Sequence, residues 1–158
     1  MQCLTPIAIK PKKNKMPVGG FATELVPCNK CVAYLDRRIR GWSFRLDQES
    51  KLHYSAFMIT LTYAPEFLPF SDTGYPTLRY TDVQKFFKRL RRNTKCKTIR
   101  YYVAGEYGKR FYRPHYHIIL FDVEPEDVIL AWSVDNVPIG FVNFRDFHSN
   151  TCAYAAKY

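Results

Sequence analysis

The spacing of apolar side chains along the chain predicts helices in four segments. The clearest covers residues 81–93, where apolar residues recur every three or four positions on one face. Weaker helical patterns cover residues 29 to about 50, a short segment that follows Pro125, and residues 150–158.

Segments rich in β-branched and aromatic residues between these helices predict strands. Residues 56–63 have the sequence AFMITLTY, and residues 99–106 and 115–121 are two further runs joined by a polar loop, as in a hairpin. Residues 140–147 alternate apolar and polar side chains, as a half-buried strand does. This mixture predicts an α+β fold in which helices flank a central, mostly antiparallel sheet.

The helix predicted over residues 81–93 has a basic outer face. Thr81 and Gln84 are spaced as a capping box at its start. Its apolar face consists of Val83, Phe86, Phe87 and Leu90, and the cations around it are Lys85, Lys88, Arg89, Arg91 and Arg92. Such a face is either simply solvated or in contact with phosphate groups, and the sequence leaves both interpretations open.

Length and composition indicate one globular domain preceded by a basic arm. The chain has 158 residues, of which 47% are hydrophobic, enough for a core without covalent support. Residues 1–20, rich in Lys and Pro and without apolar period, are expected to form the arm, and residues 21–158 the domain. The arm does not resemble a secretory signal. No apolar run approaches the roughly 20 residues that a membrane span requires, so we expect a soluble, intracellular protein with no membrane partner.

The balance of charge favours a nucleic-acid partner. Lys and Arg number 24 against 14 Asp and Glu, for a net charge of +10. A surplus this large on a small domain attracts polyanions. The 12 Tyr and 12 Phe add rings on which unpaired bases can stack, although most rings in a globular protein pack in its core.

The five cysteines cannot all pair as disulfides within one chain. Cys28 and Cys31 form a C-x-x-C motif, which in a reducing compartment is typical of a structural zinc site or a redox pair. Ordinary reduced thiols are the third interpretation. Further ligands would come from among Cys3, Cys96, Cys152, His53 and His148, and the sequence does not choose between them.

The segment around His115 and His117 predicts a metal site. Residues i and i+2 of a strand point to the same face, so both imidazoles project together while Tyr116 points to the other side. In a hairpin about the loop 107–114, Glu106 lies opposite His115 and completes a set of three ligands. This set suits Mg²⁺ or Mn²⁺, and it also suits Zn²⁺. Alternatively, Glu106 is a solvated carboxylate or a partner of Arg113.

Two tyrosines near the end of the sequence are candidate nucleophiles. On a helix Tyr154 and Tyr158 share a face, and the two alanines between them allow a close approach to a neighbouring element. Lys157 can stabilise phosphate charge or lower the pKa of a phenol. Packing is the ordinary role of two tyrosines at this spacing.

Taken together, these segments resemble the HUH endonucleases, and among them the replication initiators of gokushovirus-type (Microviridae) single-stranded DNA phages. Residues 57–63 are similar to the first motif of that family, a core strand. GEYG at 105–108 with RPHYH at 113–117 resembles its metal-binding region, and YAAKY at 154–158 its two-tyrosine motif. Residues 27–31 and 86–91 also resemble these phage proteins.

This resemblance implies a HUH/Rep-type, ferredoxin-like domain that nicks and rejoins single-stranded DNA at a replication origin. Glu106, His115 and His117 would hold a Mg²⁺ or Mn²⁺ ion that polarises the scissile phosphate. Arg113 and the cations of the helix over residues 81–93 are the candidate DNA contacts.

The resemblance also implies a covalent mechanism. Tyr154, which we favour, or Tyr158 would attack the phosphate and leave a 5′-phosphotyrosine and a free 3′-hydroxyl, with Lys157 countering the charge. The partners would be origin DNA and the host replication machinery, in the host bacterial cytoplasm. Family members continue beyond the second tyrosine, so a C-terminally truncated domain is expected.

Two other functions remain open from the residues alone. A zinc hydrolase would use His115, His117 and Glu106 with a metal-bound water, and it would need neither tyrosine. A non-catalytic basic module would bind single-stranded nucleic acid with a steep salt dependence and form no covalent adduct.

Overall fold

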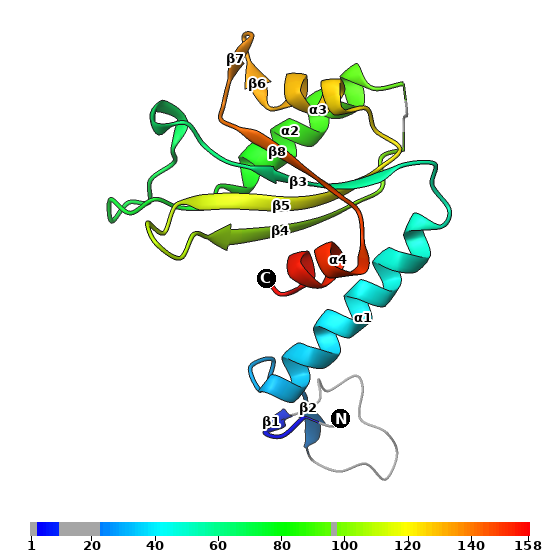
Figure 1. The fold of residues 1–158 in the computed structure, drawn as a ribbon. Helices are drawn as coiled ribbons and strands as arrows, with labels where there is room; N and C mark the ends of the chain where they lie inside the picture. The colour runs from blue at the N-terminus through cyan, green and yellow to red at the C-terminus, as the bar shows by residue number, and fades with distance from the viewer. Residues whose placement is uncertain (1–2, 10–22, 96–97) are drawn as a thin grey trace.

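A four-stranded antiparallel sheet lies at the centre of the computed structural model, which describes residues 3–9, 23–95 and 98–158 (Figure 1). In spatial order its strands are β4 (Tyr101–Tyr107), β5 (Pro114–Phe121), β3 (Ala56–Leu61) and β8 (Val142–Asp146). The predicted α+β class is therefore confirmed, and the four predicted strands are placed to within two residues at each end.

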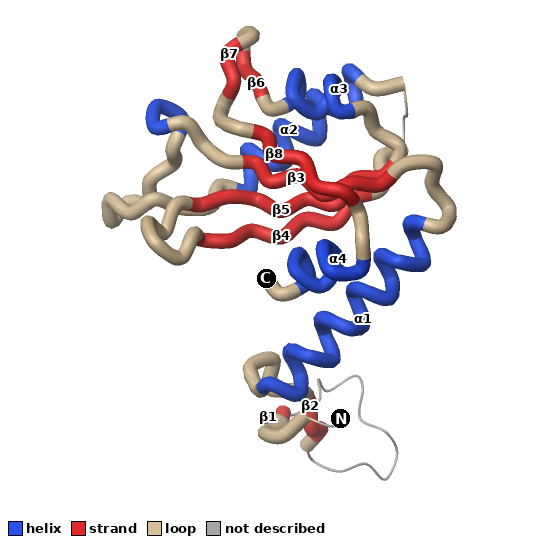
Figure 2. Tube along the Cα trace, in the orientation of Figure 1, coloured by secondary structure: helices blue, strands red, loops and turns tan. Residues whose placement is uncertain are grey.

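Helices cover both faces of the sheet (Figure 2). The helices α2 (Tyr80–Asn93) and α3 (Pro125–Ala131) pack on one face, and α1 (Val32–Ser50) and α4 (Ser149–Ala156) on the other. The chain order β3–α2–β4–β5–α3–β8, with β3 and β5 in the middle of the sheet, is the βαββαβ arrangement of a ferredoxin-like fold. The expected ferredoxin-like topology is thus present, and α1 and α4 add a layer to its second face.

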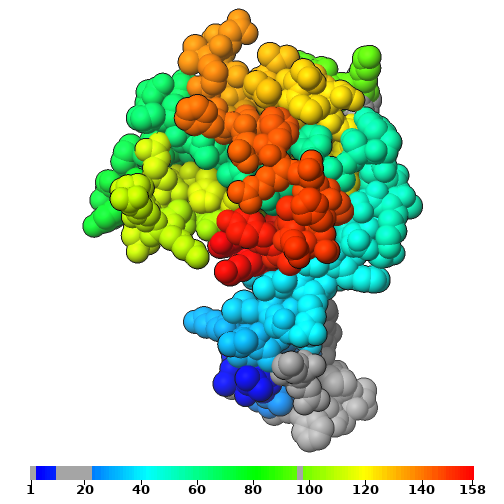
Figure 3. Space-filling model, viewed as in Figure 1, coloured from blue at the N-terminus to red at the C-terminus, as the bar shows by residue number. Residues whose placement is uncertain are grey.

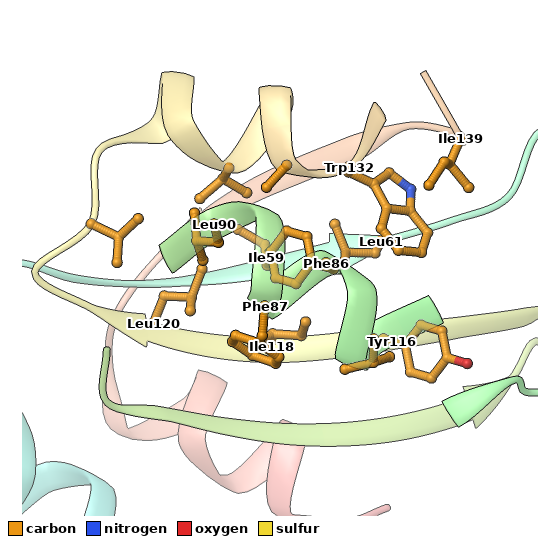
Figure 4. Close-up of a cluster of buried hydrophobic side chains, with 14 of the residues drawn as sticks. Ile59, Leu61, Phe86, Phe87, Leu90, Tyr116, Ile118, Leu120, Trp132 and Ile139 are labelled. Carbon is orange, nitrogen blue, oxygen red and sulfur yellow. The ribbon is translucent and has the colours of Figure 1, made fainter. Parts of the chain in front are cut away.

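Most of the apolar core lies between the sheet and the α2–α3 layer (Figure 4). Ile59, Ile118 and Leu120 point to this face because side chains alternate along a strand. The apolar face predicted for α2 packs against them, and all four of its residues are buried: Val83, Phe86, Phe87 and Leu90. On the opposite face Met58 and Ile119 pack against α1 and α4. β5 is buried on both faces, which explains its almost unbroken apolar sequence.

The start of α1 differs from the prediction. The helix begins at Val32 and not at residue 29, because Asn29 has a φ of 63° and turns the chain between Cys28 and Cys31. That left-handed conformation cannot continue into a right-handed helix.

The capping box predicted from Thr81 and Gln84 is wrong. α2 begins one residue earlier, with Arg79 as an N-cap that makes no side-chain cap hydrogen bond. Tertiary contacts fix this start, since the Arg79 amide donates to the Tyr116 hydroxyl (2.8 Å) and its guanidinium to Asp82 (2.8 Å).

The smaller elements were not predicted. They are β1 (Ile7–Ile9), β2 (Glu24–Val26), the 3₁₀ helix η2 (Pro65–Phe67), β6 (Ser133–Val134) and β7 (Val137–Pro138). β1 lies within the segment expected to be an arm without regular structure, and it pairs with β2. Residues 1–2 and 10–22 lie outside the described residues, so most of the expected arm is not described. Within the described ranges, no helix is long and apolar enough to cross a membrane.

Candidate functional site

The hairpin of β4 and β5 brings the three predicted metal ligands together. Glu106 lies opposite His115 in the strand register, as the length of the loop predicted. His115 and His117 point to the face that α4 covers, whereas the side chain of Tyr116 is buried on the other face near Tyr63.

The donor atoms of this cluster are close enough to surround one ion. Nε2 of His117 lies 2.8 Å, and Nε2 of His115 3.2 Å, from the same Glu106 oxygen, Oε2. One donor atom from each residue lies within 4.8 Å of the others. Two imidazoles and one carboxylate leave coordination positions open, a set that suits Mg²⁺, Mn²⁺ or Zn²⁺.

Both imidazoles are oriented by a second partner. Nδ1 of His117 lies 3.0 Å from Thr60 Oγ1, and Nδ1 of His115 lies 3.1 Å from the Arg113 carbonyl oxygen. A proton on each Nδ1 would be donated to these oxygens and would leave Nε2 free as the ligand. The sequence analysis did not identify Thr60, whose only signal is its position opposite His117 in the register.

The surroundings favour the ligand forms of the cluster. Burial, together with the nearby His115 and Arg145, lowers the pKa of His117. Burial would raise the pKa of Glu106, but hydrogen bonds from Tyr158 and His117 outweigh it and lower that pKa. A neutral imidazole and an ionised carboxylate are the forms that bind a cation.

Both predicted tyrosines lie at this cluster. The Tyr154 hydroxyl donates to Glu106 Oε2 (3.3 Å), and its ring centre is 5.0 Å from that of His117. The Tyr158 ring stacks on His117 at 6.0 Å and lies 5.6 Å from the Tyr154 ring. Burial and contact with Glu106 raise the pKa of Tyr158. The predicted pairing of the phenols is confirmed, although Tyr158 lies beyond the end of the helix.

α4 can lie close to the sheet because its inward side chains are small. Ala155 and Ala156 are fully buried, as their size suggested. The helix begins at a capping box in which the His148 amide donates to Thr151 Oγ1 (2.9 Å). Lys157 is exposed at the C-cap, with its Nζ 6.0 Å from the Tyr158 ring centre.

A hollow of about 590 Å³ opens beside Tyr154. Arg145, His148 and Asn150 are among its lining residues. Arg145 of β8 pairs with Met58, so it projects from the same face as the cluster. The sequence analysis did not identify Arg145, because only the strand register shows which face it occupies.

The predicted DNA contacts do not gather at the cluster. Lys85, Lys88, Arg91 and Arg92 are exposed on α2, which covers the opposite face of the sheet. Lys88 and Arg91 line a groove of about 680 Å³ along β4, together with Trp42, Tyr80, Tyr101 and Tyr102. This combination of cations and rings is typical of surfaces that bind single strands.

Two of the predicted contacts are occupied within the protein. Arg89 is partly buried and its Nε donates to the Ala131 carbonyl oxygen (2.7 Å), so it serves the packing of α2 on α3. The Arg113 guanidinium donates to the Tyr63 carbonyl oxygen (2.8 Å) and does not pair with Glu106.

Among the cysteines, the structure places Cys3 beside Cys28 and Cys31. The other predicted ligands lie elsewhere: Cys152 is buried against the sheet, His53 contacts Glu49 and Asp122, and His148 caps α4. Cys96 lies outside the described residues.

Comparison with known proteins adds a family to this geometry. Residues 56–158 match the family model of the phage replication-associated protein ORF2. The chain is 34% identical over 112 residues to replication-associated protein ORF2 of Spiroplasma virus 4, covering 68% of this chain and 35% of that protein. It is 28% identical to replication-associated protein VP4 of Bdellovibrio phage phiMH2K, covering 99% and 58%. It is 32% identical over 104 residues to replication-associated protein ORF4 of Chlamydia phage 1, covering 64% and 25%. No solved structure gives a significant match.

These relatives define the class as proteins associated with phage replication. Because the family model matches more than half of the chain, the chain belongs to the replication-associated protein ORF2 family. The resemblance to phage replication initiators is thereby confirmed. The chain spans 35%, 58% and 25% of the lengths of the three relatives.

Proposed function

We propose that this chain is the catalytic domain of a rolling-circle replication initiator, an HUH-type endonuclease that nicks and rejoins single-stranded DNA. The observation that supports this most strongly is the contact between a candidate nucleophile and a candidate metal site. The Tyr154 hydroxyl lies 3.3 Å from Glu106 Oε2, within the cluster of Glu106, His115 and His117. The family and its printed names agree with a role in replication and leave the chemistry open.

Glu106, His115 and His117 are the residues that would hold a divalent cation, Mg²⁺ or Mn²⁺. An ion bound there would supply Lewis-acid polarisation of the scissile phosphate and fix its position. The protein prepares these ligands, since Thr60 and the Arg113 carbonyl oxygen orient the two imidazoles.

Tyr154 would act as the nucleophile. Its phenolate oxygen attacks the phosphorus in line, so a tyrosine–phosphorus bond forms while the bond to the 3′-oxygen breaks. The phenol releases its proton to solvent, and the departing 3′-oxygen takes one up. The products are a 5′-phosphotyrosine and a free 3′-hydroxyl. Tyr154 suits this role because it is 39% exposed and lines the hollow beside the cluster.

Tyr158 and two cations would complete the reaction cycle. With its ring 5.6 Å from Tyr154, Tyr158 would attack the newly made junction while Tyr154 holds the old DNA end. Lys157 beside Tyr158 and Arg145 in the hollow would balance the phosphate charge in the transition state.

The biological setting follows from the product. A free 3′-hydroxyl is a primer, so the partners would be origin DNA and the host replication machinery, in the host bacterial cytoplasm. The groove along β4 would bind the flanking single strand through Lys88 and Arg91.

A gel assay on origin-region oligonucleotides with Mn²⁺ tests the proposal. We expect a protein–DNA band that survives denaturation, and we expect EDTA or the double change Tyr154→Phe and Tyr158→Phe to abolish it. Tyr75→Phe is the matched control, because Tyr75 is exposed in the loop that precedes α2.

The alternatives give different results in the same assay. Cleavage that persists without either tyrosine would show a metal-bound water at work, as in a zinc hydrolase. Salt-dependent binding without cleavage, on oligonucleotides that span the whole origin, would indicate a non-catalytic binding module.

A further inference from the structure

We propose that Cys3, Cys28 and Cys31 bind a structural zinc ion that fastens the N-terminal strand pair to the beginning of α1. Sγ of Cys3 lies 3.5 Å from Sγ of Cys28 and 3.6 Å from Sγ of Cys31. All three sulfur atoms fall within 4.8 Å of one another. This site is independent of the proposed DNA cleavage and lies on elements that do not contribute to that cluster.

The turn between Cys28 and Cys31 is shaped around a sulfur atom. Asn29 occupies the left-handed region, with a φ of 63°. As a result the amides of Lys30 and Cys31 both point at Cys28 Sγ, at 3.5 Å and 3.2 Å. Amide donors of this kind stabilise a thiolate, the form in which cysteine binds a metal.

Other donors add to this environment. The Cys28 amide lies 3.4 Å from Cys3 Sγ. A hydrogen bond from the Thr5 side chain, followed by those from the two amides of the turn, lowers the pKa of Cys28 to about 6. Cys31 is the N-cap of α1, where the helix dipole also favours negative charge.

A disulfide does not explain the arrangement. The three sulfurs are free thiols and converge on one point, whereas a disulfide joins two sulfurs at about 2.05 Å and leaves the third unused. Three convergent thiols are a ligand set for zinc, whose structural sites use cysteine and histidine. The described residues supply three ligands, so the fourth tetrahedral position falls to water or to a donor outside them.

The strand pair needs a stabilising element that its own residues do not provide. β1 and β2 have three residues each, and Ile7 and Leu25 are exposed. The pair lies at the far end of α1, away from the sheet and its core (Figure 3). An isolated two-stranded pair is marginally stable in water, and metal binding is a common source of folding free energy for so small a unit.

Metal analysis of the purified chain, prepared without chelators, tests the proposal. We expect zinc at one equivalent per chain, retained when His115 and His117 are both changed to Ala and lost in Cys28→Ser. Cys152→Ala is the matched control, because Cys152 is a thiol outside the cluster. Exchange with Co²⁺ should give the intense near-ultraviolet absorption of cobalt–thiolate bonds. Zinc that disappears with the histidines and persists in Cys28→Ser would overturn the assignment.

A second measurement does not depend on how the Cys28 variant folds. In the unmodified chain, alkylation of Cys3, Cys28 and Cys31 should be slow, and it should become fast after chelation, as followed by peptide mass spectrometry. Equal rates before and after chelation, or a disulfide linking two of the three cysteines, would contradict a zinc site.

Discussion

His117 illustrates how a residue of one strand prepares a ligand on the next. Its Nδ1 contacts Thr60 Oγ1 at 3.0 Å, which leaves Nε2 facing Glu106. Thr60→Val keeps the side-chain shape and removes the hydroxyl, so we expect the affinity for Mn²⁺ to fall by about 10- to 100-fold. Thr60→Ser should retain it. Calorimetric titration of the three proteins would refute this role of Thr60 by giving equal affinities.

Neighbouring cations of α2 should behave differently when removed. Because Arg89 donates to the Ala131 carbonyl oxygen, Arg89→Ala should lower the free energy of unfolding by about 1 to 2 kcal/mol and leave DNA binding unchanged. Lys88→Ala should leave stability unchanged and reduce the slope of log affinity against log salt by about 1. Urea denaturation and binding at several salt concentrations measure both quantities. The reverse pattern would show that Arg89 contacts DNA.

The sequence reached some residues of the site and not others for a physical reason. Glu106, His115 and His117 lie within one hairpin, where the two-residue period and the loop length determine their relation. Thr60 and Arg145 belong to strands far along the chain, and only the register of the assembled sheet places them nearby.

At the level of elements, two glycines should respond in opposite ways to a methyl group. A Cβ on Gly140, just before β8, would lie 2.1 Å from the Thr62 carbonyl oxygen. Gly140→Ala should therefore destabilise the protein by about 2 to 4 kcal/mol. A Cβ on Gly41 in α1 would meet nothing within 4 Å, so Gly41→Ala should stabilise by about 0.5 to 1 kcal/mol. Thermal melts that shift in the same direction for both variants would contradict this packing.

The connection between α1 and β3 should weaken as pH rises. His53 contacts Asp122 (2.6 Å) and Glu49 (3.1 Å), and Glu49 also pairs with Arg100 (2.7 Å). Burial opposes the charged imidazole, but the two carboxylates outweigh it and raise the pKa of His53. Its contribution is therefore complete below the unfolded value of about 6.5 and is lost as pH rises through the higher folded value.

Denaturation of the wild type and His53→Gln from pH 5.5 to about 8.5 measures this contribution. We expect the stability advantage of the wild type to shrink across that range. A constant difference between the two curves would show that His53 does not titrate as a partner of these carboxylates.

The elements that the sequence missed are those without an apolar period. The hairpin of β6 and β7 turns at Asp135 and Asn136, which both have positive φ, of 49° and 63°. Such a turn usually signals itself through glycine, which is absent here. The pair of β1 and β2 has three residues a side, too few for a pattern to emerge.

The whole molecule brings the site together across the third layer of the fold. α4 follows β8 and returns across the sheet, so that Tyr154 meets His117 although 37 positions separate them. No local spacing contains that contact. The predicted order of motifs indicated that the segments act together, and the packing of Ala155 and Ala156 on the sheet explains how they meet.

The central claim is that a tyrosine of this chain becomes covalently joined to DNA. Its most direct test is peptide mass spectrometry after incubation with Mn²⁺ and an origin oligonucleotide. We predict a nucleotide attached through its 5′-phosphate to Tyr154, and to Tyr158 in the variant Tyr154→Phe. Cleaved DNA with free 5′-phosphates and no modified tyrosine would contradict the account.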